Sequence, residues 1–198
     1  MGISELKRGP GTGTLELLDA AALDRTLRRI AQEILERHPV CGDVALVGIP
    51  SRGVELAVRL GRLLAEIGGG EPPFCGSVDV SMHRDDLHAR RRVTVVEPTR
   101  LPESLAGRTV ILVDDVLQSG RTCRAAMDGL SSFGRPARIE YAVLVDRGLR
   151  ELPIAADYVG RRVDTALMER VCVRLRPLDE EEGVWLKASS CEGSGSFR

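Results

Sequence analysis

The amino-acid sequence predicts an α/β fold, in which an open, mostly parallel, twisted sheet is flanked by helices. Short apolar runs, of the kind found in strands buried on both faces, alternate along the chain with segments whose apolar residues recur at helical spacing. Strands that alternate with helices are typical of one doubly wound domain. The composition agrees, because 43% hydrophobic and 29% charged residues over 198 positions suit one well-buried globular domain.

The two ends of the chain are expected to lie outside this domain. Residues 1–14 are rich in Gly, Pro and Thr and are predicted to be mobile. Residues 189–198 form a low-complexity tail that is predicted to be disordered. The domain is therefore expected to span residues 15–188.

The first predicted element is a helix over residues 19–37. Its apolar residues follow helical spacing, at Leu23, Leu27, Ile30, Ile34 and Leu35. Asp19 is expected to cap this helix, because its side chain can accept a hydrogen bond from a backbone N–H of the first turn.

The remaining predicted elements alternate between strand and helix. Strands are expected over residues 44–49, 74–82, 110–113, 139–145 and 158–159, and helices over residues 54–67 and 123–133. Residues 93–97 are expected to belong to a hairpin over the ligand site. Residues 171–175 and 184–186 are expected to pair as two late strands around an acidic turn.

Charge and cysteine content narrow the class of protein. A formal net charge of −1 excludes a generic binder of polyanions, so contact with nucleic acid would need a local basic patch. The five cysteines include no CxxC pair, which argues against zinc and predicts reduced thiols in a cytoplasmic protein. Cys123 is expected to be a small buried helix residue, with a nucleophile as the alternative. No apolar run reaches the length of a membrane span, so no membrane partner is expected.

The segment from Val110 to Thr122 carries the strongest functional signal. Four apolar residues lead into two adjacent acids, Asp114 and Asp115, at the carboxyl end of a predicted buried strand. Ligands of open α/β sheets bind at this edge. Adjacent acids on a strand are expected to point apart, an arrangement that suits two neighbouring sugar hydroxyls. The segment matches neither a Walker A loop nor a dinucleotide fingerprint.

The loop after the two acids is expected to bind phosphate. It opens a helix, whose free N–H groups and dipole attract anions. Ser119 and Thr122 add hydroxyl donors, and Gly120 allows the backbone to approach a ligand without a Cβ. The alternative interpretation of the loop is an ordinary helix cap. Taken together with the two acids, the loop indicates a phosphorylated sugar as ligand.

Several segments in the same order resemble one enzyme family. Val110 to Thr122 resembles the phosphoribosyl-pyrophosphate (PRPP) motif of the type I phosphoribosyltransferases. Further segments resemble the PyrR branch of that family, the pyrimidine operon attenuators with uracil phosphoribosyltransferase activity; these are residues 47–53, 79–87, 134–136, 142–154 and 156–160. The likeness covers residues 18–186, and it implies a type I phosphoribosyltransferase fold with a small hood and a flexible hairpin.

The resemblance implies a PRPP site and a role for each matching residue. Asp114 and Asp115 would hold the ribose hydroxyls, Arg52 would bind pyrophosphate, and Arg84 would close over it; these four are the expected catalytic residues. The complete expected PRPP-binding set is Ser51, Arg52, Gly53, Asp114, Asp115, Val116, Leu117, Gln118, Ser119, Gly120, Arg121 and Thr122. No metal ligand is expected from the protein itself, because Mg²⁺ would arrive with PRPP.

The resemblance also implies an acceptor base and regulatory partners. Uracil would lie near Asp146, Arg147 and Val163, and the reaction would convert uracil and PRPP to UMP and pyrophosphate. UMP or UTP would control binding to the messenger RNA leader of a pyrimidine operon, and the chain would form a homo-oligomer, a dimer or higher. The expected RNA-binding residues are Arg28, Arg29, Gln32, Arg37, Arg161 and Arg162.

The sequence departs from the PyrR pattern at positions that leave two alternatives open. Gln118 and Ser119 replace the usual Tyr-Thr of the phosphate loop, Leu149 replaces the usual His, and residues 161–166 lack the familiar Pro and Ser. One alternative is an RNA-binding regulator or nucleotide sensor with little or no transferase activity. The other is a phosphoribosyltransferase for a different base.

Overall fold

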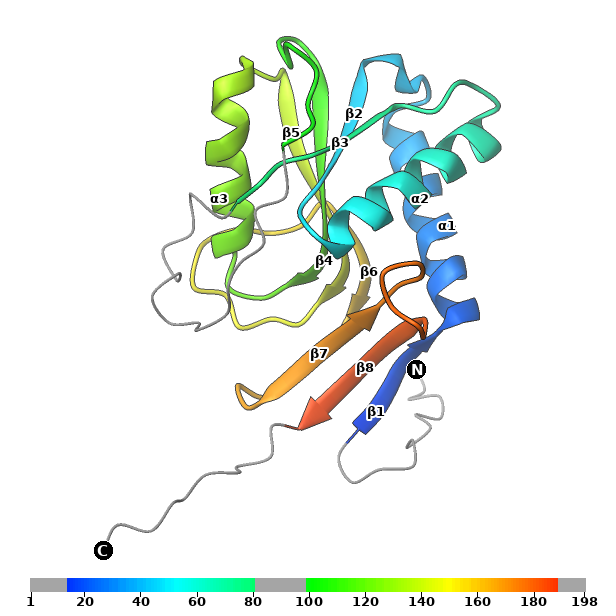
Figure 1. Ribbon diagram of the computed structural model, residues 1–198, viewed down its shortest axis with the longest axis vertical. Coiled ribbons are helices and arrows are strands. Elements are labelled where there is room, and N and C mark those ends of the chain that lie inside the picture. Colours follow the sequence, from blue (N-terminus) through cyan, green and yellow to red (C-terminus); the bar gives the residue numbers. More distant parts are fainter. Residues whose placement is uncertain (1–13, 81–98, 189–198) are drawn as a thin grey trace, which may run out of the picture.

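The computed structural model describes residues 14–80 and 99–188, and it places them in two sheets (Figure 1). The central sheet has the strand order β3-β2-β4-β5-β6, and every neighbouring pair in it is parallel. Its strands are β2 Val44–Gly48, β3 Phe74–Ser77, β4 Thr109–Leu117, β5 Arg138–Asp146 and β6 Tyr158–Arg162. The predicted open parallel sheet is therefore confirmed.

A second, antiparallel sheet lies beyond the carboxyl ends of the central strands (Figure 1). It has the order β1-β8-β7, with β1 Thr14–Asp19, β7 Glu169–Arg174 and β8 Gly183–Ala188. The predicted pairing of the two late strands is confirmed. Strand β1 was not predicted from the sequence; it pairs with β8 and so joins the two ends of the described chain. This small sheet corresponds to the expected hood.

Helices cover both faces of the central sheet because each strand buries alternate residues on opposite sides. Ile111 and Val113 of β4 pack in one core with α1 Ala20–Arg37 and α2 Arg52–Gly68. Val110 and Leu112 pack in a second core with α3 Arg121–Leu130. The run that predicted a strand buried on both faces is therefore covered on each side by a different layer.

Local chemistry fixes where the helices begin and end. The Asp19 side chain accepts a hydrogen bond of 2.7 Å from the backbone N–H of Ala22, which confirms the predicted cap of α1. Helix α2 begins at Arg52, two residues before the predicted start, and ends at Gly68. The next residue, Gly69, caps it with a left-handed backbone, which is typical of a helix end.

The strands differ in length from the prediction, and the differences in β4 and β3 are described here because these strands border the site. Strand β4 continues through Leu117, so Asp114 and Asp115 lie within the strand near its carboxyl end. Strand β3 ends at Ser77, where the backbone pairs with Arg100 in a single bridge. The predicted hairpin around residues 93–97, residues 1–13 and the predicted tail 189–198 lie outside the described residues. Residue 14, the last of the segment 1–14 that was predicted to be mobile, belongs instead to β1.

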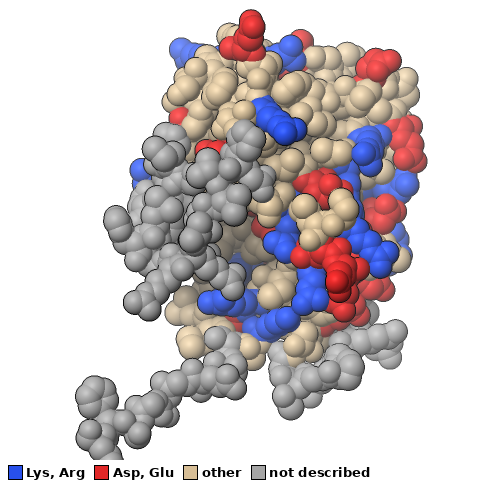
Figure 2. All heavy atoms as spheres, in the orientation of Figure 1, with Lys and Arg blue, Asp and Glu red and all other residues tan. Residues whose placement is uncertain are grey.

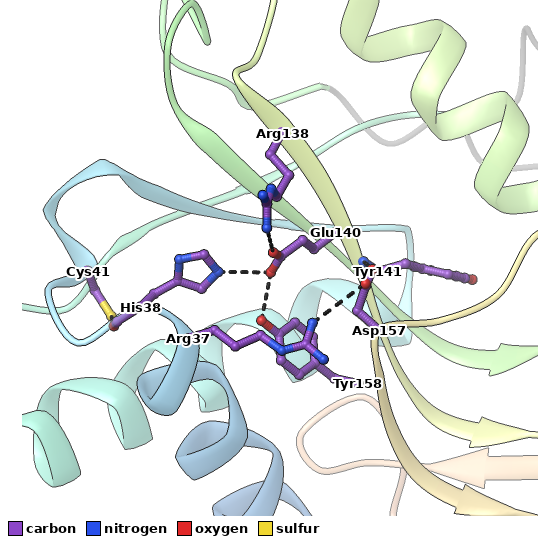
Figure 3. A network of polar contacts seen from close by, with 8 residues as sticks. All are labelled: Arg37, His38, Cys41, Arg138, Glu140, Tyr141, Asp157 and Tyr158. Carbon is purple, nitrogen blue, oxygen red and sulfur yellow. Dashed lines mark hydrogen bonds and ion pairs between the residues drawn. The ribbon is translucent and has the colours of Figure 1, made fainter.

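A buried polar network ties α1 to the amino ends of β5 and β6 (Figure 3). Glu140 is 3% exposed and accepts hydrogen bonds from the Tyr158 hydroxyl (2.6 Å) and from the His38 ring (2.9 Å). The Arg37 guanidinium lies over the Tyr158 ring, 4.8 Å from its centre. Burial alone would raise the pKa of Glu140, but these hydrogen bonds hold it below its usual range.

Candidate functional site

A cavity of about 1090 Å³ lies between the carboxyl ends of the central strands and the small sheet. The two acids of β4, the loop after them and the first residues of α3 form one wall. Strands β7 and β8 form the other. The lining residues are Arg52, residues 114–123, Tyr141, Arg147, Glu151, Leu167, residues 169–174 and Lys187. Figure 2 shows basic and acidic side chains gathered in adjoining patches over the small sheet.

The two acids of β4 face the same cavity and interact with each other. The backbone N–H of Asp115 donates to Oδ1 of Asp114 at 2.9 Å, and the Tyr141 hydroxyl donates to Oδ2 at 3.0 Å. Both acids line the cavity, and the bond from the Asp115 N–H fixes the Asp114 carboxyl there. That the two side chains point apart stays a prediction. The result is a pair of adjacent carboxyl groups at one wall of the cavity.

Burial sets the protonation of this pair. It raises the pKa of Asp114 well above its usual range, and the charge of Asp115 raises it further. Burial also raises the pKa of Asp115, while the bond with Asp114 and the positive charge of Arg52 oppose that rise. Two buried like charges are unfavourable without a partner, so the pair is suited to ligand hydroxyls and to a cation.

The loop from Gln118 to Thr122 is anchored on its outer side. The N–H groups of Glu151 and Leu152 both donate to the Ser119 carbonyl at 3.0 Å, so this carbonyl already has its hydrogen-bond partners within the protein. No acceptor within residues 14–80 or 99–188 binds the N–H groups of Ser119 and Gly120. These two N–H groups therefore remain for a ligand, as expected of a phosphate loop.

Gly120 is required by both conformation and space. Its φ of +91° lies in the left-handed region, and a Cβ at this position would stand 3.2 Å from Cβ of Ile154. The loop keeps its shape because Ile154 packs behind it. The expectation that Gly120 lets the backbone approach a phosphate stays a prediction.

The expected pyrophosphate loop brings one of its three residues to the cavity. Arg52 lines the cavity, whereas Ser51 and Gly53 are not among its lining residues. The Pro50–Ser51 peptide is cis. Gly53 allows α2 to approach β4, because a Cβ at Gly53 would meet the Val113 carbonyl oxygen at 2.4 Å. Arg84, the other expected pyrophosphate ligand, lies outside the described residues.

Of the three expected uracil-side residues, only Arg147 lines the cavity. It is 5% exposed, and its guanidinium donates to Thr165 Oγ1 at 2.9 Å and to the Ala166 carbonyl at 3.0 Å. Burial lowers its pKa. The Asp146 carboxyl pairs with Arg150 at 2.6 Å, and the Asp146 carbonyl accepts from the Val163 N–H at 2.9 Å. These residues hold the loop after β6 against the loop after β5.

The position that departs from the family pattern, Leu149, adopts a left-handed backbone with φ of +60°. Non-glycine residues occupy this region infrequently, and it is least strained for Asn, Asp and His. Leu149 lies in the loop after β5, and Glu151 and Leu152 of the same loop bind the Ser119 carbonyl. This constrained turn therefore lies between the residues expected to bind uracil and the loop expected to bind phosphate.

Several cavity residues gave no functional signal in the sequence. Tyr141 lies within an apolar strand run, and its hydroxyl is revealed as a site group only by its bond to Asp114. Burial and the Asp114 charge raise the pKa of Tyr141, so this hydroxyl remains a donor. Arg170 and Lys187 occupy opposite positions on β7 and β8, where the pairing of the strands brings both to the cavity.

The expected RNA-binding arginines gather on α1 and β6, away from the cavity. Arg28 pairs with Asp24 and Glu66, Arg29 pairs with Glu33 and donates to the Gly160 carbonyl, and Arg37 pairs with Asp157. Arg161 donates to the Leu17 carbonyl. Arg162 lines a smaller cavity of about 250 Å³ together with Glu33, Asp157 and Val159. Gln32 is exposed on the same helix.

The described part of the chain has no metal-binding cluster and no helix that could cross a membrane. Within residues 14–80 and 99–188, no group of three or more His, Cys, Asp or Glu side chains could hold a metal ion. No helix in those ranges is long and apolar enough to cross a membrane. Cys123 is buried, and burial followed by the Asp114 charge raises its pKa to about 12, so its thiol is not a nucleophile at neutral pH.

The comparisons with known proteins agree with this architecture. Residues 13–177 match the family model described as the phosphoribosyl transferase domain. The chain is 52% identical over 167 residues to the bifunctional protein PyrR of Roseiflexus sp., covering 84% of this chain and 91% of that protein. It is 51% identical over 176 residues to the bifunctional protein PyrR of Chloroflexus aurantiacus, covering 88% and 96%.

Solved structures support the fold. A hypoxanthine phosphoribosyl transferase from Trypanosoma cruzi superposes with a TM-score of 0.68 at 18% identity, over 92% of this chain and 94% of that one. A hypoxanthine phosphoribosyltransferase from Staphylococcus aureus superposes with a TM-score of 0.64 at 17% identity, over 92% and 93%. With the cavity, the acid pair and the phosphate loop in place, these matches show that the chain belongs to the phosphoribosyltransferase family and, within it, to the PyrR proteins.

Proposed function

We propose that the protein is a uracil phosphoribosyltransferase, which converts uracil and PRPP to UMP and pyrophosphate, and that it also regulates pyrimidine genes as a nucleotide-dependent RNA-binding protein. One observation carries the transferase proposal: the acid pair of β4, the open N–H groups of the phosphate loop and Arg52 all line one cavity. This set provides partners for the hydroxyls, the 5-phosphate and the pyrophosphate of PRPP. The relatives named PyrR favour uracil as the acceptor.

The proposed chemistry requires no protein nucleophile. The bond from ribose C1 to pyrophosphate breaks, and C1 gains oxocarbenium character. Uracil N1 attacks from the opposite face and gives up its proton to water or to the released pyrophosphate. Negative charge accumulates on the leaving pyrophosphate, so Arg52 stabilises the transition state more than the ground state. Asp114 and Asp115 fix the ribose, and the loop from Gln118 to Thr122 fixes the 5-phosphate.

The donor set of the cavity also fits Mg²⁺ carried by PRPP. Carboxylate oxygens together with substrate phosphates are the ligands that Mg²⁺ prefers, and Asp114 and Asp115 both offer carboxyl oxygens to the cavity. Bound Mg²⁺ would neutralise charge on the departing pyrophosphate.

The described thiols Cys41, Cys75, Cys123 and Cys172 are unpaired, which supports a cytoplasmic location.

A panel of free bases tests the transferase proposal. The protein is incubated with PRPP, Mg²⁺ and uracil, cytosine, hypoxanthine or guanine, and nucleotide and pyrophosphate are quantified together. We expect UMP in a 1:1 ratio to pyrophosphate and no product from the purines. A purine nucleotide as the main product would support the alternative of a different base, and no nucleotide from any base would leave a nucleotide sensor.

The basic face of α1 and β6 favours RNA as a regulatory partner. Its arginines are held in exposed ion pairs with Asp24, Glu33, Glu66 and Asp157, which contribute little to stability and can exchange for phosphate. Arg162 and the smaller cavity beside it provide a recess in which a base could be read. We propose that UMP or UTP in the main cavity changes the RNA affinity of this face by linkage.

Titration of a labelled pyrimidine-operon leader transcript tests RNA binding. We expect tighter binding with UMP than without it, and a loss of affinity between 50 and 200 mM salt (~tenfold or more) because phosphate contacts release counterions. Gln32 and Arg162 offer substitutions that leave the ion pairs of α1 intact. An RNA affinity that is the same with and without UMP, and the same for unrelated RNA sequences, would contradict the regulatory proposal.

A further inference from the structure

An ion pair joins the expected pyrophosphate loop to the small sheet. Nε of Arg52 lies 3.2 Å from Oδ2 of Asp179, and Nη2 lies 2.8 Å from Oδ1. Asp179 stands in the loop between β7 and β8, 127 residues away in the sequence. Bidentate pairs of this kind fix the plane of the guanidinium as well as its position.

Asp179 is also held in place by the backbone of its own loop. Its Oδ2 accepts from the Leu175 N–H at 2.9 Å, and its own N–H donates to the Leu175 carbonyl at 2.8 Å. Burial alone would raise the pKa of Asp179, but the Leu175 N–H and the Arg52 charge hold it below its usual range. The carboxylate is therefore charged at neutral pH and rigidly placed.

The geometry leaves part of the guanidinium for a ligand. Asp179 uses Nε and one hydrogen of Nη2, so both hydrogens of Nη1 and the second hydrogen of Nη2 remain. Arg52 lines the cavity, whereas Asp179 is not among the lining residues. Asp179 thus holds Arg52 from behind.

A second arginine of α2 fastens the same loop without facing the cavity. Arg59 binds Glu182 at 2.6 Å and the Arg176 carbonyl at 2.6 Å, and it also binds Glu55 of its own helix. Arg59 does not line the cavity. The loop between β7 and β8 therefore has two arginine ties, one at the ligand site and one away from it, and the second provides a matched control for the first.

We propose that Asp179 is a positioning residue for pyrophosphate capture, holding the Arg52 guanidinium with its remaining N–H groups directed at the pyrophosphate of PRPP. The proposal rests on the role given to Arg52 in the proposed function. A free arginine side chain must be ordered when the ligand binds, and that ordering opposes binding. A guanidinium already fixed by Asp179 avoids this loss, so the small sheet contributes to PRPP affinity without touching PRPP.

Equilibrium binding tests the proposal, because UMP uses the ribose and 5-phosphate sites but carries no pyrophosphate. Titration calorimetry with Mg²⁺ compares PRPP and UMP binding to the wild type, Asp179→Asn and Glu182→Gln. We expect Asp179→Asn to weaken PRPP binding about tenfold, or about 1.4 kcal/mol. UMP affinity should stay unchanged, and Glu182→Gln should change neither ligand. Equal weakening of PRPP and UMP, or the same loss in Glu182→Gln, would overturn the proposal.

A double-mutant cycle separates positioning from a structural effect. In an Arg52→Gln background, adding Asp179→Asn should cost no further PRPP affinity, because the carboxylate acts through the guanidinium. An undiminished loss would show that Asp179 acts by another route. If Asp179→Asn folds poorly, Asp179→Glu keeps the charge and displaces the guanidinium, and wild-type PRPP affinity in that variant would overturn the proposal.

These binding measurements do not depend on turnover. A wild-type protein that binds PRPP but forms no UMP would contradict the transferase proposal and leave the role of Asp179 intact. A protein that forms UMP but shows no selective loss of PRPP affinity in Asp179→Asn would contradict the role of Asp179 and leave the transferase proposal intact.

Discussion

Replacing Asp114 by Asn should stabilise the free protein while weakening its ligand site. The Asp114 carboxyl is 6% exposed and adjacent to Asp115, so its ionised form is unfavourable in the absence of ligand. An asparagine of the same shape keeps an acceptor for the Asp115 N–H and a partner for the Tyr141 hydroxyl. It removes the buried charge and keeps the packing.

The size and the pH dependence of this gain follow from the raised pKa. Each unit by which the fold raises the pKa of Asp114 corresponds to about 1.4 kcal/mol of stability lost on ionisation. For a domain of this size each kcal/mol moves the melting temperature by about 2–4 °C. The folded protein binds the proton of the Asp114 carboxyl more tightly than the unfolded chain does. The loss of wild-type stability is therefore absent below the pKa of this carboxyl in the unfolded chain, and it grows as pH rises toward the pKa in the folded protein.

Differential scanning fluorimetry of the wild type and Asp114→Asn between pH 4 and pH 8 measures this difference. We expect the two melting temperatures to converge at the acid end and Asp114→Asn to melt higher at pH 7, by about 3 °C or more per pKa unit. PRPP should stabilise the wild type but much less so the variant. A variant that melts lower than the wild type at pH 7 would refute the reasoning.

Three further predictions concern other parts of the structure. Glu140→Gln should destabilise the fold by about 1.5–3 kcal/mol at pH 7, as expected for hydrogen bonds to a buried charge. Because the pKa of Glu140 is lowered, the difference in stability between variant and wild type, measured by chemical denaturation, should disappear as pH falls below about 4.5. A pH-independent difference would count against the network. Gly120→Ala should weaken UMP and PRPP binding together, since a left-handed alanine costs about 1–2 kcal/mol and its Cβ meets Ile154; calorimetry showing unchanged UMP affinity would disprove this. Cys123 should resist thiol reagents at pH 8 until the protein unfolds, because its pKa is about 12, and rapid modification of Cys123 in the native protein, read by mass spectrometry, would contradict the burial.

The central sheet could be predicted because its signals are local. The apolar run of β4 and the helical spacing of α1 are read directly along the chain, and the Asp19 cap follows from a single side chain. The place of the loop from Gln118 to Thr122 at the cavity could be predicted for the same reason, since the strand, the acids, Gly120 and the helix follow one another without interruption.

The small sheet and the residues acting through it were harder to predict. Strand β1 is short, and its partner β8 is contributed by the other end of the chain, so nothing nearby in sequence marks it. Tyr141 has the appearance of a core residue in its strand, and Asp179 that of an ordinary turn acid. Their contacts with Asp114 and Arg52 form only when the chain folds.

The most direct test of the site is UMP formation by the wild type and by Asp115→Asn, measured with saturating uracil and Mg²⁺ over a range of PRPP concentrations. Asp115 is half-buried at the cavity wall and binds no basic side chain in the described chain through a hydrogen bond, so its replacement should leave the fold intact. We expect UMP and pyrophosphate in equal amounts from the wild type and a KM for PRPP raised about tenfold or more in the variant, the loss expected for a charged hydrogen bond to a substrate hydroxyl. A wild type that forms no UMP, or a variant whose KM for PRPP is unchanged, would contradict this expectation.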